Sequence, residues 1–105
     1  MGKPDLNDRL CSLWEAHRRA PFPGGFRGVD VAGVELILLD SSVAGLVMQE
    51  LRGGLGDDDV AILWACITDL DKVLPLIDDE YCRDYYARLR VLAELVAPRY
   101  TPSAI

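Results

Sequence analysis

The spacing of hydrophobic residues predicts a long amphipathic helix in the middle of the chain, between residues 59 and 79. Apolar side chains recur there at intervals of three and four residues, as one face of a helix requires. The main stripe consists of Val60, Leu63, Ile67, Leu70, Leu74 and Ile77. A second row of apolar residues widens this face, so we expect residues 60–77 to form the centre of a helical bundle. Pro75 must end or kink this helix, because its ring clashes with the carbonyl group of residue 71.

Two further helices are predicted near the ends of the chain. The first opens at Pro4 and Asp5 and ends before the segment Pro-Phe-Pro-Gly-Gly at residues 21–25, which breaks a helix. Its apolar stripe consists of Leu6, Leu10, Leu13, Trp14 and His17. The last helix begins at the capping residues Asp78 or Asp79 and ends at Pro98. Its stripe consists of Tyr81, Tyr85, Leu89, Leu92 and Val96. Residues 100–105 carry no periodic pattern, and we expect them to fray.

Residues 26–52 allow two interpretations. In the first, residues 27–31 and 34–39 form a β-hairpin, and a helix capped at Asp40, Ser41 or Ser42 continues to Arg52. In the second, one long helix begins at Asp30. We favour the hairpin, because apolar residues alternate at Val29 and Val31 and because the long helix would contain Gly33. Alanine suits a type I′ turn badly, so the turn at Ala32 and Gly33 is expected to be type I with a glycine bulge.

The predicted fold is therefore mainly α, with α+β as the alternative class if the hairpin forms. We expect about four helices and a short hairpin near residues 27–39, packed as a single bundle-like domain over residues 1–105. A chain of 105 residues is long enough for one hydrophobic core and too short for two independent ones.

The charge of the chain is concentrated in its central part. The formal net charge is −6, and residues 57–80 hold eight acidic side chains against Lys72 alone, a balance of −7. An acidic chain without a stripe of Lys and Arg is a poor candidate for nucleic-acid binding, which depends on neutralising phosphates. A charged protein partner would be basic. We expect Asp69, Asp71 and Asp78 to bind it, together with Trp64, which lies off the main stripe of its helix.

A homodimer is the second expected association. If residues 34–39 form a strand, its alternate side chains leave by opposite faces, and both faces are apolar. One bundle covers only one face of a two-stranded hairpin easily, so a second copy could cover the other. The residues expected at this contact are Leu36, Ile37, Leu38, Leu39, Val43 and Val47.

No motif in the sequence indicates a catalytic residue, a metal site or a cofactor. His17 is the only histidine, and we expect a backbone carbonyl group to satisfy it at the edge of the core. The pair Asp69 and Asp71 begins like a calcium loop, but the glycine and the further oxygen ligand of that loop are missing. Cys11, Cys66 and Cys82 lack the spacing of a metal site.

These patterns favour a small acidic protein whose function is protein–protein interaction, as an adaptor, an inhibitor or immunity-type binder, or an assembly subunit. The chain has no apolar run long enough to cross a membrane and no signal-peptide pattern, so we expect no membrane association and a cytoplasmic location. The alternative is an activity on a small molecule, or one that depends on a divalent metal, seated among the acidic residues and the tyrosines.

Overall fold

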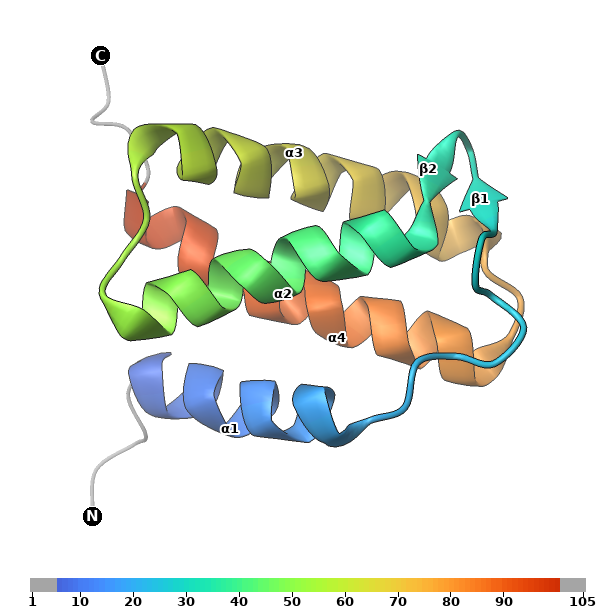
Figure 1. The fold of residues 1–105 in the computed structure, drawn as a ribbon, viewed down its shortest axis with the longest axis horizontal. Helices are drawn as coiled ribbons and strands as arrows, with labels where there is room; N and C mark the ends of the chain where they lie inside the picture. Colours follow the sequence, from blue (N-terminus) through green and yellow to red (C-terminus); the bar gives the residue numbers. More distant parts are fainter. Residues whose placement is uncertain (1–5, 101–105) are drawn as a thin grey trace.

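A computed structural model of the chain describes residues 6–100, which form four α-helices, two short strands and two 3-10 turns (Figure 1). In chain order they are α1 (Leu6–Arg19), β1 (Asp30–Val31), β2 (Val34–Glu35), α2 (Leu36–Arg52), α3 (Asp57–Val73), η1 (Leu74–Leu76), α4 (Glu80–Val96) and η2 (Ala97–Tyr100). This architecture confirms the predicted mainly α bundle with a small hairpin. Within residues 6–100, no helix is long and apolar enough to cross a membrane.

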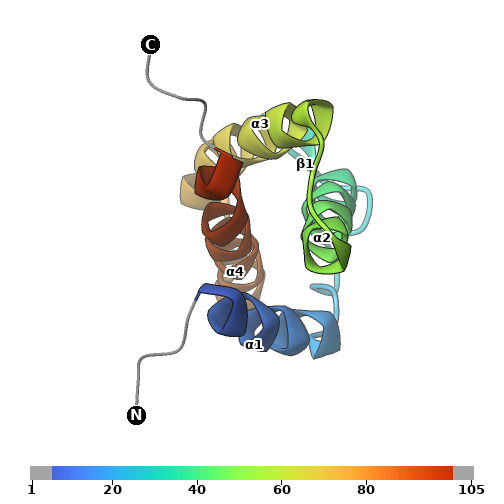
Figure 2. The ribbon, with the colours of Figure 1, turned by 90° about the vertical axis from the view of Figure 1, so that its left-hand side faces the viewer.

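The four helices surround one hydrophobic core. Seen end-on, they form a ring in which α1 and α3 lie on opposite sides, with α2 and α4 between them (Figure 2). The centre of the packing is α4, which contacts each of the other three helices, whereas α3 packs mainly against α2 and α4. The prediction that residues 60–77 form the centre was therefore wrong. The apolar face of α4 carries seven buried residues, including Tyr85 and Tyr86, and these large side chains fill the space between the helices.

The predicted strand over residues 34–39 is confirmed at Val34 and Glu35 but was wrong for residues 36–39, and the predicted caps Asp40, Ser41 and Ser42 were wrong, because α2 already begins at Leu36. Glu35 is the N-cap of α2, and its carboxylate accepts hydrogen bonds from the backbone N–H groups of Ile37 and Leu38. These bonds satisfy donors that the first turn of a helix leaves open. Within residues 6–100, only residues 30–31 and 34–35 pair as antiparallel strands.

The turn of the hairpin also differs from the expected type I turn with a bulge. Ala32 has φ 52° and Gly33 has φ 80°. Positive φ at both central residues is the signature of a type I′ turn, whose twist matches that of the paired strands. Ala32 therefore accepts a left-handed backbone conformation that glycine adopts more easily.

The predicted ends of the last two long helices are confirmed. α3 ends at Val73 and Pro75 lies in η1, while the Asp79 carboxylate caps α4 by accepting a hydrogen bond from the Cys82 N–H at 2.9 Å. The prediction that the chain frays from residue 100 was wrong for Tyr100, whose hydroxyl group bonds the Glu50 carboxylate and accepts from the Leu55 N–H. Residues 101–105, and the expected cap at Asp5, lie outside the described part of the chain.

Candidate functional site

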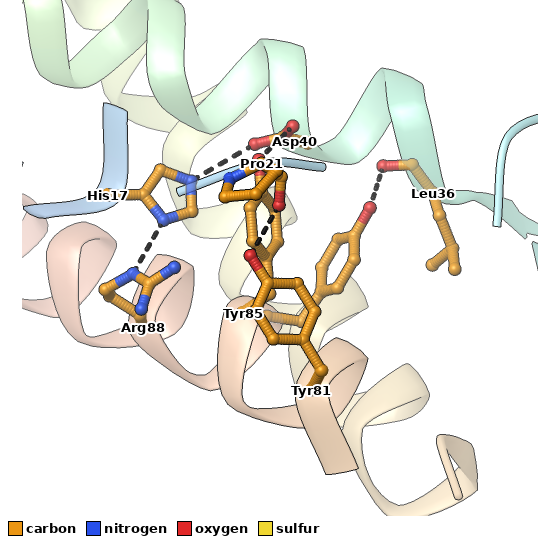
Figure 3. A network of polar contacts seen from close by, with 8 residues as sticks. His17, Pro21, Leu36, Asp40, Tyr81, Tyr85 and Arg88 are labelled. Carbon is orange, nitrogen blue, oxygen red and sulfur yellow. Dashed lines mark hydrogen bonds and ion pairs between the residues drawn. The ribbon is translucent and has the colours of Figure 1, made fainter. Parts of the chain in front are cut away.

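A network of polar side chains lies inside the bundle and joins α1, α2 and α4 (Figure 3). His17 of α1 lies at its centre and is only 3 % exposed. Its Nε2 atom lies 3.4 Å from Asp40 Oδ1 on α2, and its Nδ1 atom accepts a hydrogen bond from Arg88 Nε on α4 at 2.9 Å. The prediction that a backbone carbonyl group satisfies His17 was wrong, because two charged side chains hold it instead.

Three tyrosines of α4 extend this network. The Tyr85 hydroxyl group donates to Asp40 Oδ2 at 2.9 Å, and its ring lies 4.4 Å from the His17 ring between centroids. Tyr86 donates to the Leu36 carbonyl oxygen at 2.6 Å, and Tyr81 donates to the Pro21 carbonyl oxygen at 2.6 Å (Figure 3). Burial raises the pKa of Tyr85, and the hydrogen bond to Asp40 raises it further. Burial is also the main cause of the raised pKa of Tyr86. Both side chains are therefore neutral donors at neutral pH.

The hydrogen bonds of His17 leave no ring nitrogen for a reaction. Nδ1 accepts from a guanidinium group, which has no lone pair to offer, so Nδ1 carries no proton and Nε2–H donates to Asp40. A general base must reach the proton that it removes, and both nitrogens here are occupied inside the core. The network places a carboxylate and a guanidinium group on the two sides of a neutral ring, which suits it to fixing how three helices pack.

The structure separates the parts of the expected metal or small-molecule site. Among residues 6–100, no three His, Cys, Asp or Glu side chains come close enough together to hold a metal ion. Of the tyrosines on α4, Tyr85 bonds Asp40 of α2, while Tyr81 and Tyr86 bond backbone carbonyl groups; the acidic residues 57–59, 69 and 71 lie on α3. Burial raises the pKa of the Cys66 and Cys82 thiols, with nearby aspartates adding to the effect, so neither thiol is activated as a nucleophile.

The described surface has a groove between α2 and α3 with a volume of about 430 Å³. The turn of the hairpin borders it, and its apolar lining includes Leu38, which is 65 % exposed, and Ile62, which is 50 % exposed. Three charged residues, Glu35, Asp69 and Lys72, also line it. Lys72 Nζ lies 3.9 Å from Asp69 Oδ1, which is a loose surface ion pair.

The four residues predicted to bind a partner do not form one cluster. Asp69 lines the groove, seven residues and about two helical turns after Ile62, on the same flank of α3. Trp64 is 39 % exposed, and it shares the other flank with Asp71, the residue seven positions later. Asp71 accepts two hydrogen bonds from Arg90 of α4, at 2.6 and 3.4 Å, and these bonds lower its pKa. Asp78 is exposed in the loop between η1 and α4.

The residues predicted to form a dimer contact are mostly part of the core. Leu36, Val43 and Val47 are fully buried and Leu39 is 4 % exposed. Ile37 is half-buried, and Leu38 is the one exposed side chain of the set. Because residues 36–39 are helical, they do not present the two opposite apolar faces of a strand. The homodimer stays a prediction, and Leu38 is the residue that could carry it.

A second groove lies between α1 and α4, with a volume of about 520 Å³. Leu13 of α1 and Val91 and Leu95 of α4 line it, and Val91 is 42 % exposed. Its charged residues, Asp8 and Arg9, are of opposite sign, so their formal charges cancel. This surface therefore gives no charge preference for a partner.

Comparisons with protein-family models, with curated proteins and with solved structures found no match to this chain.

Proposed function

We propose that this chain is a non-enzymatic protein–protein interaction module with a basic partner, acting as an adaptor, an inhibitor or immunity-type binder, or a subunit of an assembly. The observation that carries the proposal is the outer surface of α3. It exposes two large apolar side chains, Ile62 and Trp64, on a helix that holds five aspartates and Lys72 as its one basic residue. Apolar side chains beside charges of one sign are a surface that a complementary protein can cover.

Covering the exposed apolar side chains of α3 with a partner would lower the free energy. Fully burying an aliphatic or aromatic side chain is worth about 1.5–3 kcal/mol, and exposed residues such as Ile62 and Trp64 realise only part of this in the free protein. Single exposed apolar residues are common, so burial alone would be a weak argument. The surrounding carboxylates add a preference for the sign of the partner and accelerate its approach at low salt.

The buried network supports the non-enzymatic part of the proposal. Both nitrogens of the only histidine are bonded to charged side chains, and the histidine is 3 % exposed. A reaction there would first have to break the contacts that join three helices. The three cysteines are unpaired, which supports a cytoplasmic location, where thiols stay reduced.

A pair of synthetic helices of opposite charge tests this proposal. Each is an amphipathic peptide of about 18 residues, about 27 Å long, with leucine on one face and either lysine or glutamate on the other. Fluorescence anisotropy with the full chain should show binding of the lysine peptide, and added salt should weaken that binding. Equal binding of the two peptides, or binding that does not change with salt, would refute the proposal.

A further inference from the structure

We infer that the groove between α2 and α3 is the docking site for a basic amphipathic helix of another protein. An aliphatic side chain of that helix would enter the groove, and its Lys or Arg side chains would lie beside the bordering carboxylates. This inference rests on the proposed function and adds to it the surface that binds and the form of the partner.

The groove offers an apolar contact from two helices at once. Leu38 of α2 and Ile62 of α3 are the large exposed apolar side chains of its lining, and the buried Leu39 and Cys66 lie in the same lining. Side chains that are exposed next to a hollow can be covered by a single inserted residue from a partner. Such anchors carry most of the affinity in protein interfaces.

The charges around the groove select a cationic partner. Its lining holds Glu35, Asp69 and Lys72, and two more aspartates are neighbours of lining residues. Asp58 precedes Ile62 by one helical turn, and Asp30 is the cross-strand partner of Glu35. The lining itself holds two carboxylates and one ammonium group, and Asp58 and Asp30 add negative charge beside residues of that lining. The positive end of the α2 dipole points toward this region, but the Glu35 carboxylate that caps it offsets that charge.

The same charges argue against a second copy of this chain as the occupant. A copy carries a formal net charge of −6. A contact that brings two such acidic surfaces together places like charges opposite one another and lowers affinity. A basic helix of another protein instead gains from each carboxylate, and it can displace the loose pairing of Lys72 with Asp69 at 3.9 Å.

The other flank of α3 is less suited to this partner. Asp57 and Asp71 lie seven positions before and after Trp64 on this flank, and Asp71 is already bonded twice by Arg90, which also bonds Glu94 at 2.8 Å. Trp64 is less exposed than either Leu38 or Ile62, and it lines neither of the two grooves. A cation that approaches this flank would have to compete with a guanidinium group that is in place.

The shape favours a helix as the docking element. The groove runs between two helices, which is the arrangement that receives the apolar face of a third helix. Strand addition would need a free sheet edge, and each strand of the hairpin pairs over only two residues.

The test measures binding of the labelled lysine–leucine peptide to three variants of the full chain. The groove variant combines Leu38→Ala with Ile62→Ala, and the flank variant combines Trp64→Ala with Asp71→Asn. The control is Val91→Ala, which truncates an exposed apolar side chain on α4. The groove variant should weaken binding by about tenfold or more, while the flank variant and the control should change it by less than about twofold. Far-UV circular dichroism should show that all variants remain helical.

A second pair of variants isolates the charge. Asp58→Asn with Asp69→Asn should slow association several-fold at low salt and much less at high salt. Glu15→Gln with Asp84→Asn removes the same charge from α1 and α4, and it should have a smaller effect on the association rate.

Each contrary outcome has a distinct meaning. Loss of binding only in the flank variant would overturn the groove and leave the proposed function standing. Absence of binding to the wild-type chain would overturn both. A wild-type dimer in light scattering that Leu38→Ala converts to a monomer would show that a second copy occupies the groove, which overturns the inference.

Discussion

Replacing His17 with leucine tests whether the buried network holds the bundle together. The substitution removes the acceptor of Arg88 Nε at 2.9 Å and the longer contact of 3.4 Å with Asp40. A hydrogen bond to a charged group is worth about 1.5–3 kcal/mol, and a buried partner that is left unpaired adds its desolvation cost. Asp40 keeps its hydrogen bond from Tyr85 and its side chain is 18 % exposed, so losing the contact with His17 costs little free energy at Asp40. We expect His17→Leu to lower the free energy of unfolding by about 2–4 kcal/mol.

A double-mutant cycle with Arg88 measures the interaction itself. Arg88→Met should cost less than His17→Leu, because Nη2 of Arg88 is buried and finds no acceptor among the described residues. With both partners apolar, neither is left unpaired, so the double variant should be about 1–3 kcal/mol more stable than the sum of the single effects predicts. Urea unfolding followed by circular dichroism gives all four values.

A matched control separates this coupling from a general effect of removing arginine. Arg83→Met lies on the same helix at an exposed position, where its contact with the Ile77 carbonyl oxygen is long, at 3.4 Å. Its effect should add to that of His17→Leu. If the His17 and Arg88 substitutions also add within about 0.5 kcal/mol, the network does not stabilise the packing as described.

Three further results follow from the structure. Tyr85 and Tyr86 have raised pKa values in the folded state, so the stability that they contribute is present below about pH 10 and is lost as pH rises above that value. Their tyrosinate absorbance should therefore appear together with the loss of helix. Ionisation of both tyrosines in a native protein would contradict this. Gly54→Ala should lower the free energy of unfolding by about 1–3 kcal/mol, because Gly54 has φ 125° and a Cβ atom there would lie 3.1 Å from the Tyr100 hydroxyl oxygen. Gly45→Ala inside α2 should instead raise the free energy of unfolding by about 0.5–1 kcal/mol. Equal effects of the two substitutions in chemical denaturation would contradict the backbone conformations described for these glycines. Calcium, magnesium or zinc should leave the melting temperature unchanged, since a metal at a hundred times its dissociation constant would add about 2.7 kcal/mol and shift it by several degrees.

The helix boundaries that depend on single residues could be predicted from the sequence. Pro75 removes a backbone donor and Asp79 supplies a capping carboxylate, and both effects act within one helical turn. The start of α2 could not be predicted in the same way. Residues 36–39 are all apolar, so they show neither helical nor strand periodicity. The cap is a glutamate, which is not among the preferred N-cap residues, whereas Asp40 and the two serines that follow it are.

Part of the buried network could be predicted from the sequence. His17, Asp40 and Arg88 each lie three or four residues from apolar residues that are buried or packed against the core, so each is a polar residue on the inner face of a helix. Three such positions on three helices indicate a shared polar contact. The sequence could not predict which of these residues pair, because the two partners of His17 are 23 and 71 positions away from it in the chain.

The groove between α2 and α3 could not be predicted from the sequence for a related reason. The predicted strand over residues 34–39 directs the Leu38 side chain toward either the bundle or a second copy. In the helix, Leu38 is 65 % exposed and lines the same groove as Ile62. The acidic charge of residues 57–80 could be counted from the sequence, but which carboxylates are free could not. Arg90, which neutralises Asp71, lies 19 positions away in the chain.

The most direct test of the proposed docking surface is a nuclear magnetic resonance titration of the isotope-labelled chain with the lysine–leucine peptide. The backbone amide signals that shift should belong to the hairpin turn, the first half of α2 and the outer face of α3, around Leu38 and Ile62. They should shift in a saturable way, and Leu38→Ala with Ile62→Ala should abolish the shifts. Saturable shifts centred on Val91 and Leu95 between α1 and α4, or the absence of any saturable shift, would contradict the account.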